Sequence, residues 1–423
     1  MKIKEINSVQ EKIYEFNVNG LSVHYIPKKD FSNSVAMLTS KFGGKDVEFS
    51  INGGESFKKY PEGIAHFLEH KMFEMPSEIN VFNEFSKLGA SVNAFTSSSQ
   101  TSYYFETTEN FYDNLKLLMD MVFTPHLTDE NVAKEKGIIT EEIRMYDDNP
   151  GFQGYIETMK ALYKENPIRE DVAGSVESIN SLTKEDLLDC YNAFYNPSNM
   201  LLVISGDLDL NLIENIIKEK TPAKKDINLV KKSYNEKEES YKKNINLDMN
   251  LNVPNYIYAF KYNVQGENLL RESIAASLMT SLIFSESSSF YEDKLKSGEI
   301  NDSFSQSITV ENDHSEILFG GESMDPEHTI SVIENYIFSM KNNTSFFNGL
   351  ARELERIKKS KTGSFVNIFN STSSITNILT RFLVGEKDLN MYMEEIKNID
   401  ILDIEKVYDN MFNKKSASKI IIK

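Results

Sequence analysis

Runs of apolar residues in the first half of the chain predict strands, then helices, then one more strand. Residues 21–26 and 34–42 carry such runs between glycine and lysine breaks, as two paired strands would. Residues 91–96 and 101–106 flank a polar turn and predict a hairpin, and a helix is expected from about Gly63 onwards. Apolar residues at helical spacing predict four further helices, and the apolar run after them predicts a buried strand. These segments are residues 109–121, 128–146, 152–163 and 183–194 for the helices, and 200–205 for the strand.

The second half of the chain repeats this pattern. Residues 179–205 and 399–422 each contain an acidic helix start, an amphipathic helix, a polar turn and a final apolar strand. A long amphipathic helix is expected upstream of each, at 128–146 and at 347–366. A fixed order of elements that recurs within one chain indicates duplication. We therefore predict an α+β fold made of two homologous domains.

The stretch between the two halves is rich in charge and has no apolar periodicity. Residues 221–245 read TPAKKDINLVKKSYNEKEESYKKNI, which is typical of a linker. A chain of 423 residues also exceeds the usual size of a single core, so two domains are expected. The predicted boundaries are 1–220 for the first domain, 221–245 for the linker and 246–423 for the second domain.

Composition and charge exclude several classes of partner. With 46 basic and 64 acidic residues the net charge is −18, which argues against nucleic acid and anionic membrane surfaces as partners. No apolar run reaches the length of a transmembrane helix, and the first residues lack the apolar core of a signal peptide. A single cysteine, Cys190, excludes an intrachain disulfide. These features together predict a cytoplasmic protein.

The sequence HFLEH at residues 66–70 is the strongest chemical signal. His66, Glu69 and His70 occupy positions i, i+3 and i+4, so on a helix they share one face. Neutral imidazole is a good zinc ligand, and a carboxylate beside the metal can act on a bound water. This order, the reverse of His-Glu-x-x-His, marks the inverted zinc metallopeptidases. The alternative is an amphipathic helix with two ordinary histidines.

A catalytic zinc site needs a third protein ligand, and residues 134–146 are the best candidate stretch. On the predicted helix Glu135 and Glu142 lie seven residues apart and therefore on the same face, whereas Glu141 points elsewhere. For an arbitrary pair of glutamates, a solvated helix face is the more common explanation.

Four segments in order resemble the family of pitrilysin, insulin-degrading enzyme and mitochondrial processing peptidase: HFLEHKMFE, SVNAFTSSSQTSYYFE, EKGIITEEIRMYDDNP and FYNPSNMLLVISGDLD. The resemblance implies that His66, His70 and Glu142 bind one zinc ion per chain. It implies that Glu69 is the general base that takes a proton from zinc-bound water. Glu135 matches a second family glutamate that supports the catalytic site.

The same resemblance implies an architecture and a mode of substrate binding. The length matches the half-size branch, in which each chain holds two homologous α+β domains, antiparallel-rich sheets covered by helices, and forms half of a clamshell chamber. Residues 91–96 resemble the family's edge strand, against which an extended peptide lies. Asn93, Ala94 and Phe95 are the predicted substrate-binding residues, through main-chain pairing of the peptide with the strand. A plain core strand is the alternative.

One part of the family pattern is missing. Active relatives use an Arg and a Tyr from a second-half motif, and the corresponding region, residues 290–304, contains neither at the expected places. Substitution by Lys294 or Asn301 is the weaker explanation. We favour a homologous partner subunit that supplies the Arg and Tyr in a heterodimer, with a homodimer as the alternative.

The function implied is a zinc-dependent endopeptidase acting on small or unfolded peptides in an enclosed chamber. Two alternatives come from other classes. A non-catalytic scaffold or core subunit of a larger complex would need none of the four site residues, and a metal-binding regulatory module would not need Glu69 between its ligands.

Overall fold

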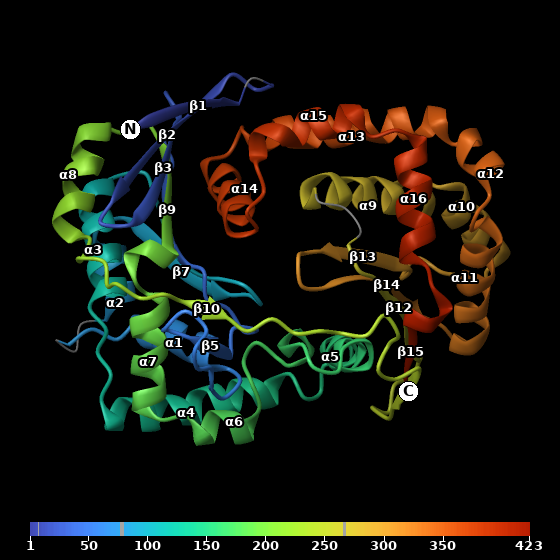
Figure 1. Ribbon diagram of the computed structural model, residues 1–423, viewed down its shortest axis with the longest axis horizontal. Coiled ribbons are helices and arrows are strands. Elements are labelled where there is room, and N and C mark those ends of the chain that lie inside the picture. Colours follow the sequence, from blue (N-terminus) through green and yellow to red (C-terminus); the bar gives the residue numbers. More distant parts are fainter. Residues whose placement is uncertain (7, 77–79, 265–267) are drawn as a thin grey trace. The chain divides into compact units, whose positions relative to one another are not determined.

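The computed structural model describes residues 1–6, 8–76, 80–264 and 268–423, which form two compact units, each built on a β-sheet with helices (Figure 1). Unit 1 comprises Met1–Arg144, Glu170–Lys232 and Val366–Asn390. Unit 2 comprises Met145–Arg169, Ser233–Phe365 and Met391–Lys423. The predicted α+β class with two domains is confirmed.

The main sheet of unit 1 has seven strands in the order β1-β2-β3-β9-β4-β8-β7. Its β3 and β9 are parallel, and the other neighbours are antiparallel. The two early runs predicted as paired strands are β3 and β4, but β9 lies between them. Every residue of β9 is buried, so this strand belongs at the centre of the sheet rather than at its edge. The strands are β1 (Lys2–Ile6), β2 (Glu11–Val18), β3 (Leu21–Pro27), β4 (Ser34–Ser40), β7 (Ala90–Thr96), β8 (Thr101–Thr107) and β9 (Met200–Gly206), and a small second sheet holds β5 (Glu48–Ser50), β6 (Lys58–Lys59) and β10 (Val230–Lys231).

Helices cover both faces of the central strands of unit 1. Helix α3 packs on β4 and β8, and α14 packs on β4 and β9. In Figure 1, α14 lies on the opposite side of the sheet from α3 and α8. Both β4 and β9 are buried along their whole length, which such two-sided cover requires. The helices are α1 (Ile64–Met72), α2 (Val81–Lys87), α3 (Phe111–Phe123), α4 (Asp129–Met145), α6 (Val176–Ser181), α7 (Lys184–Phe194), α8 (Leu210–Lys220) and α14 (Thr372–Val384).

The sheet of unit 2 repeats the topology of unit 1. Its order is β11-β15-β12-β14-β13, with β11 and β15 parallel and the other neighbours antiparallel. In unit 1, the strands β3-β9-β4-β8-β7 have the same order of one parallel pair followed by antiparallel pairs. The predicted duplication is therefore visible in the strand pairing. The strands are β11 (Asn244–Leu247), β12 (Asn255–Lys261), β13 (Ser305–Val310), β14 (Ser315–Glu322) and β15 (Ala417–Ile422).

The long helix predicted at 347–366 is divided in two. Helix α12 ends at Gly349 and α13 begins at Ala351, with Leu350 between them. The helices associated with unit 2 are α5 (Pro150–Leu162), α9 (Leu269–Phe284), α10 (Ser289–Ser297), α11 (Pro326–Met340), α12 (Thr344–Gly349), α13 (Ala351–Ile368), α15 (Tyr392–Asn398) and α16 (Ile401–Met411). Short 3-10 helices occupy Pro167–Arg169, Pro197–Asn199, Leu389–Met391 and Lys414–Ser416.

Two helices have exchanged units: α5 lies in the first half of the chain but belongs to unit 2, and α14 lies in the second half but belongs to unit 1. Helix α5 packs on β12 and β15 of unit 2, whereas α14 packs on the sheet of unit 1. Gly154 permits the approach of α5, because a Cβ there would lie 2.5 Å from Cδ1 of Ile422. The units are therefore discontinuous, unlike the contiguous segments 1–220 and 246–423 expected from the sequence. Such an exchange depends on tertiary packing, which apolar periodicity does not report.

The charged segment 221–245 contributes to both units. Its β10 pairs with β5, and β11 begins at Asn244 and pairs with β15. The carboxylate of Glu236 accepts backbone hydrogen bonds from three consecutive residues after α5. In the described part of the chain no helix is long and apolar enough to cross a membrane.

Candidate metal centre

Helix α1 presents the HFLEH motif with its polar residues away from the core. It begins after Gly63, whose φ of 87° is in the left-handed region and whose Cβ, if present, would lie 2.4 Å from the Ala173 carbonyl oxygen. One face of the helix is buried in unit 1 by Ile64, Ala65, Phe67, Leu68, Lys71 and Met72. The other face leaves His66, Glu69 and His70 half-buried. The predicted helix is confirmed.

Helix α4 brings the acidic residues to this face. Val132, Ile139 and Ile143 seat the helix against the core, and Glu135 is only 5% exposed. Glu142 is half-buried. Glu141 is exposed and forms an ion pair of 2.6 Å with Arg144. The structure therefore directs Glu142 toward the histidines and Glu141 toward solvent. Helical spacing predicts that these two glutamates point apart, and the family resemblance implies that Glu142 is the one at the histidines.

Glu142 lies against both histidines. Its Oε1 is 3.8 Å from Nε2 of His66, and its Oε2 is 3.5 Å from Nε2 of His70. One ligand atom from each of the three residues lies within 4.8 Å of the others. Ligands at tetrahedral zinc lie about 3.3 Å apart, given metal distances of about 2.0–2.2 Å. Two imidazoles and one carboxylate at this spacing fit zinc, and no second group of this kind occurs among the described residues.

Glu135 orients His70 without joining this group. Nδ1 of His70 is 2.9 Å from Oε1 of Glu135, which leaves Nε2 of the ring toward Glu142. Burial works against the charged forms of both residues, but their hydrogen bond and attraction raise the pKa of His70 and lower the pKa of Glu135. Burial and the neighbouring His70 lower the pKa of His66 to about 4. His66 is therefore neutral at pH 7, as a metal ligand must be.

Glu69 is held by the end of strand β7. The hydroxyl of Thr96 donates a hydrogen bond of 2.5 Å to Oε2 of Glu69. Burial raises the pKa of Glu69, although the hydrogen bond from Thr96 opposes the shift. Sequence reasoning did not single out Thr96. The one indication of its role in the sequence was its position at the end of the predicted hairpin strand, residues 91–96.

Strand β7, which contains Asn93, Ala94 and Phe95, ends the strand order of the unit 1 sheet. In the described residues it pairs with β8 alone. Asn93 is exposed, and Ala94 and Phe95 are half-buried. The backbone N–H of Ala94 donates to Oδ1 of its neighbour Asn93 at 2.9 Å. Ala94 does not bond to β8, because bonded pairs alternate from Ser97–Gln100 and the Ala94–Tyr103 pair lies between them. The predicted sheet edge is present, and its role in substrate binding stays a prediction.

Residues 290–304, where the family pattern has an Arg and a Tyr, form part of α10 and the turn after it. Lys294 pairs with Glu299 at 2.9 Å. Asn301 donates to the Glu322 carbonyl oxygen at 2.9 Å and caps the turn through its own oxygen. Both side chains are thus engaged within unit 2.

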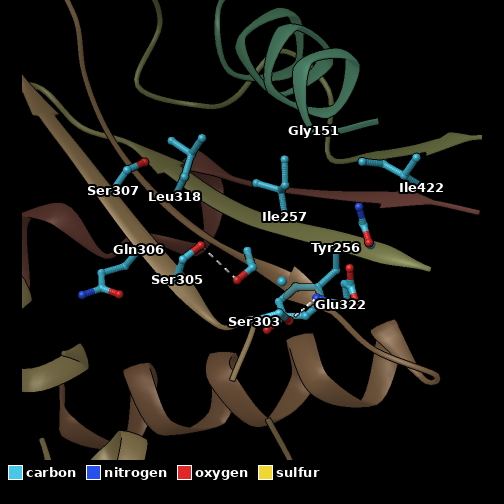
Figure 2. Close-up of a pocket in the computed structure, with 13 residues that line it drawn as sticks. Gly151, Tyr256, Ile257, Ser303, Ser305, Gln306, Ser307, Leu318, Glu322 and Ile422 are labelled. Carbon is cyan, nitrogen blue, oxygen red and sulfur yellow. Dashed lines mark hydrogen bonds between the residues drawn. The ribbon is translucent and has the colours of Figure 1, made fainter. Parts of the chain in front are cut away.

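Unit 2 also contains a cavity of about 370 Å³ over its sheet (Figure 2). Strands β12, β13 and β14 form most of its wall, and Gly151 of α5 borders it. Of its lining side chains only Tyr256 and Glu322 can ionise. This lining offers no set of metal ligands.

Two family models match the chain. One, described as insulinase (peptidase family M16), matches residues 47–175, and the other, described as the peptidase M16 inactive domain, matches residues 181–360. The chain is 36% identical over 410 residues to the uncharacterized zinc protease YmfH of Bacillus subtilis, covering 95% of this chain and 94% of that protein.

Solved structures show the same fold. An M16-like peptidase from Alicyclobacillus acidocaldarius superposes with a TM-score of 0.90 at 30% identity, covering 97% of this chain and 98% of that one. A protease from Helicobacter pylori superposes with a TM-score of 0.81 over 98% of this chain and 100% of that one. At 18% identity, the second likeness concerns the fold alone.

Proposed function

Because this chain belongs to the insulinase (M16) family of peptidases, we propose that it is a zinc-dependent endopeptidase acting on small or unfolded peptides. The observation that carries the proposal is the meeting of His66, His70 and Glu142 within 4.8 Å, with Glu69 on the same helix. A non-catalytic scaffold would need neither the three ligands nor the carboxylate between the histidines.

In this proposal His66, His70 and Glu142 hold one zinc ion. When bound, zinc would polarise the scissile carbonyl and lower the pKa of a water toward about 7. Glu69 accepts a proton from the attacking water and returns it to the leaving amine. This role is served best by a carboxylate whose pKa is raised toward the working pH. Its partial burial supports that role, since burial raises the pKa of Glu69. Glu135 keeps the His70 ring in the orientation that turns Nε2 toward the metal site.

The substrate binds along β7 as an added strand. Main-chain pairing accepts many sequences, provided that the peptide is extended, so folded proteins are excluded. The support for this step is the contact between Thr96 in β7 and Glu69. A peptide aligned on Asn93, Ala94 and Phe95 is thereby directed to the general base.

A partner subunit completes the site. The developing oxyanion needs donors, each worth several kcal/mol, and Lys294 and Asn301 are engaged elsewhere. We propose a homologous chain that supplies an Arg and a Tyr and encloses the substrate chamber in a heterodimer, with a homodimer as the alternative.

The test compares wild type with Glu69→Gln. Bound zinc is measured by elemental analysis, and cleavage of an unfolded peptide is followed at high enzyme concentration, with and without an added homologous chain. The expected result is that both proteins bind zinc and that only wild type, not Glu69→Gln, cleaves the peptide. A wild type that binds no zinc contradicts the proposal, and zinc without cleavage under every condition favours the scaffold.

A further inference from the structure

Lys71 directly follows His70 and is fully buried, with 0% exposure. It lies on the core face of α1 beside Phe67 and Leu68, where an apolar residue would be expected. Burying an ammonium group without partners is costly, so a lysine in this place needs compensating contacts. Sequence periodicity could have flagged it, since it is the only charged residue on the buried face of α1.

The contacts of the Lys71 ammonium lead to the metal centre. Its Nζ lies 2.5 Å from Oε2 of Glu74 and 3.9 Å from Oε2 of Glu135. The other oxygen of Glu135 is the one bonded to Nδ1 of His70 at 2.9 Å. One carboxylate therefore lies between a buried cation and a predicted zinc ligand. This chain of contacts connects Lys71 to His70 through a second residue as well as through the backbone.

Lys71 also joins the two helices that hold the ligands. Its Nζ donates to the backbone carbonyl of Asn131 in the first turn of α4 at 3.3 Å. Helix α1 carries both histidines, whereas α4 carries Glu135 and, two turns later, Glu142. Fixing Asn131 and Glu135 against α1 therefore fixes the position of Glu142 relative to the imidazoles.

We propose that Lys71 is a positioning residue of the metal centre, which acts through Glu135: this carboxylate holds His70 and keeps α4, with its Glu142, against α1. The inference rests on the proposed function, because it assumes that His66, His70 and Glu142 bind zinc. The rival explanation is a local ion pair with Glu74 three residues along, which would stabilise the end of α1 without affecting the metal.

The test is a double-mutant cycle of Lys71→Met and Glu135→Gln in the full chain. Methionine is unbranched, retains most of the length of the lysine side chain without its charge, and suits a buried face. Zinc affinity is measured by competition with a chelator, and the thermal stability of the zinc-free protein is measured in parallel. Outer partners of metal ligands contribute about 10- to 100-fold to affinity, so Glu135→Gln should weaken zinc binding by that order and Lys71→Met, one contact further out, by up to about 10-fold.

Coupling separates positioning from plain stability. If Lys71 acts through Glu135, Lys71→Met should weaken zinc binding much less in the Glu135→Gln background than in wild type. Glu74→Gln is the matched control, since it removes the nearest carboxylate but should keep wild-type affinity. Equal effects of Lys71→Met in both backgrounds, or loss of affinity in Glu74→Gln, would overturn the inference.

Two further outcomes are informative. If Lys71→Met does not fold, Lys71→Gln, which keeps a donor but loses the charge, takes its place in the same cycle with the same expectation. If wild type binds and uses zinc while the Lys71 variants bind it equally well, this inference fails alone. If wild type binds no zinc, the proposed function fails first.

Discussion

The hydroxyl of Thr96, in edge strand β7, donates a 2.5 Å hydrogen bond to the carboxylate of Glu69 in helix α1. The strand proposed to bind the peptide and the residue proposed to activate water are thus joined directly. The bond also favours the ionised form of a carboxylate whose pKa burial raises.

Replacing Thr96 by Val should move the acidic limb of the kcat/KM profile to higher pH. Without the hydroxyl, the pKa of Glu69 rises further, and a general base works only at pH values above its own pKa. Thr96→Ser keeps the donor and should retain the wild-type profile. Superimposable profiles for Thr96→Val and wild type would show that the bond does not tune the base.

Glu142→Gln should abolish stable zinc binding, whereas Glu141→Gln should leave it unchanged. Loss of an outer partner of a metal ligand costs about 10- to 100-fold in affinity, so loss of a ligand should cost more than about 100-fold. The control removes an adjacent carboxylate that is exposed and paired with Arg144. Chelator competition measures both zinc affinities. If Glu141→Gln weakened zinc binding more than Glu142→Gln, the assignment of the third ligand would be wrong.

Ala94→Pro should reduce kcat/KM for peptides by roughly 2- to 10-fold with zinc retained. Proline removes an N–H that does not bond to β8, so the sheet keeps its own pairing while an added strand loses one bond worth about 0.5–1.5 kcal/mol. Zinc content and the unfolding temperature serve as controls. Unchanged kinetics for a series of extended peptides would argue against binding along β7.

The isolated chain should cleave peptides weakly, and addition of a homologous chain with the missing Arg and Tyr should increase the rate strongly. One oxyanion donor is worth about 10²- to 10³-fold in kcat. Analytical ultracentrifugation of the mixture should show a heterodimer under the same conditions. Full activity of the chain alone would contradict the division of labour between two subunits.

The HFLEH motif, the helix that carries it and the β7–β8 hairpin were all predictable from the sequence, because each depends on residues close together in the chain. The repeat of strands and helices was predictable for the same reason. The choice of Glu142 over Glu141 followed from helical spacing and the family resemblance, and the structure places Glu142 by the histidines.

The order of strands and the exchange of α5 and α14 between units were decided only by tertiary structure. The sequence reports that residues 200–204 are apolar and predicts a strand at 200–205, but not that this strand inserts between β3 and β4, since many pairings bury the same side chains. Likewise, the contacts of Thr96 with Glu69 and of Lys71 with Glu135 join segments 27 and 64 residues apart. By itself, the sequence determined the chemical groups available and the local elements that carry them. Tertiary packing decided which groups meet, because burial brings together residues that no local periodicity connects.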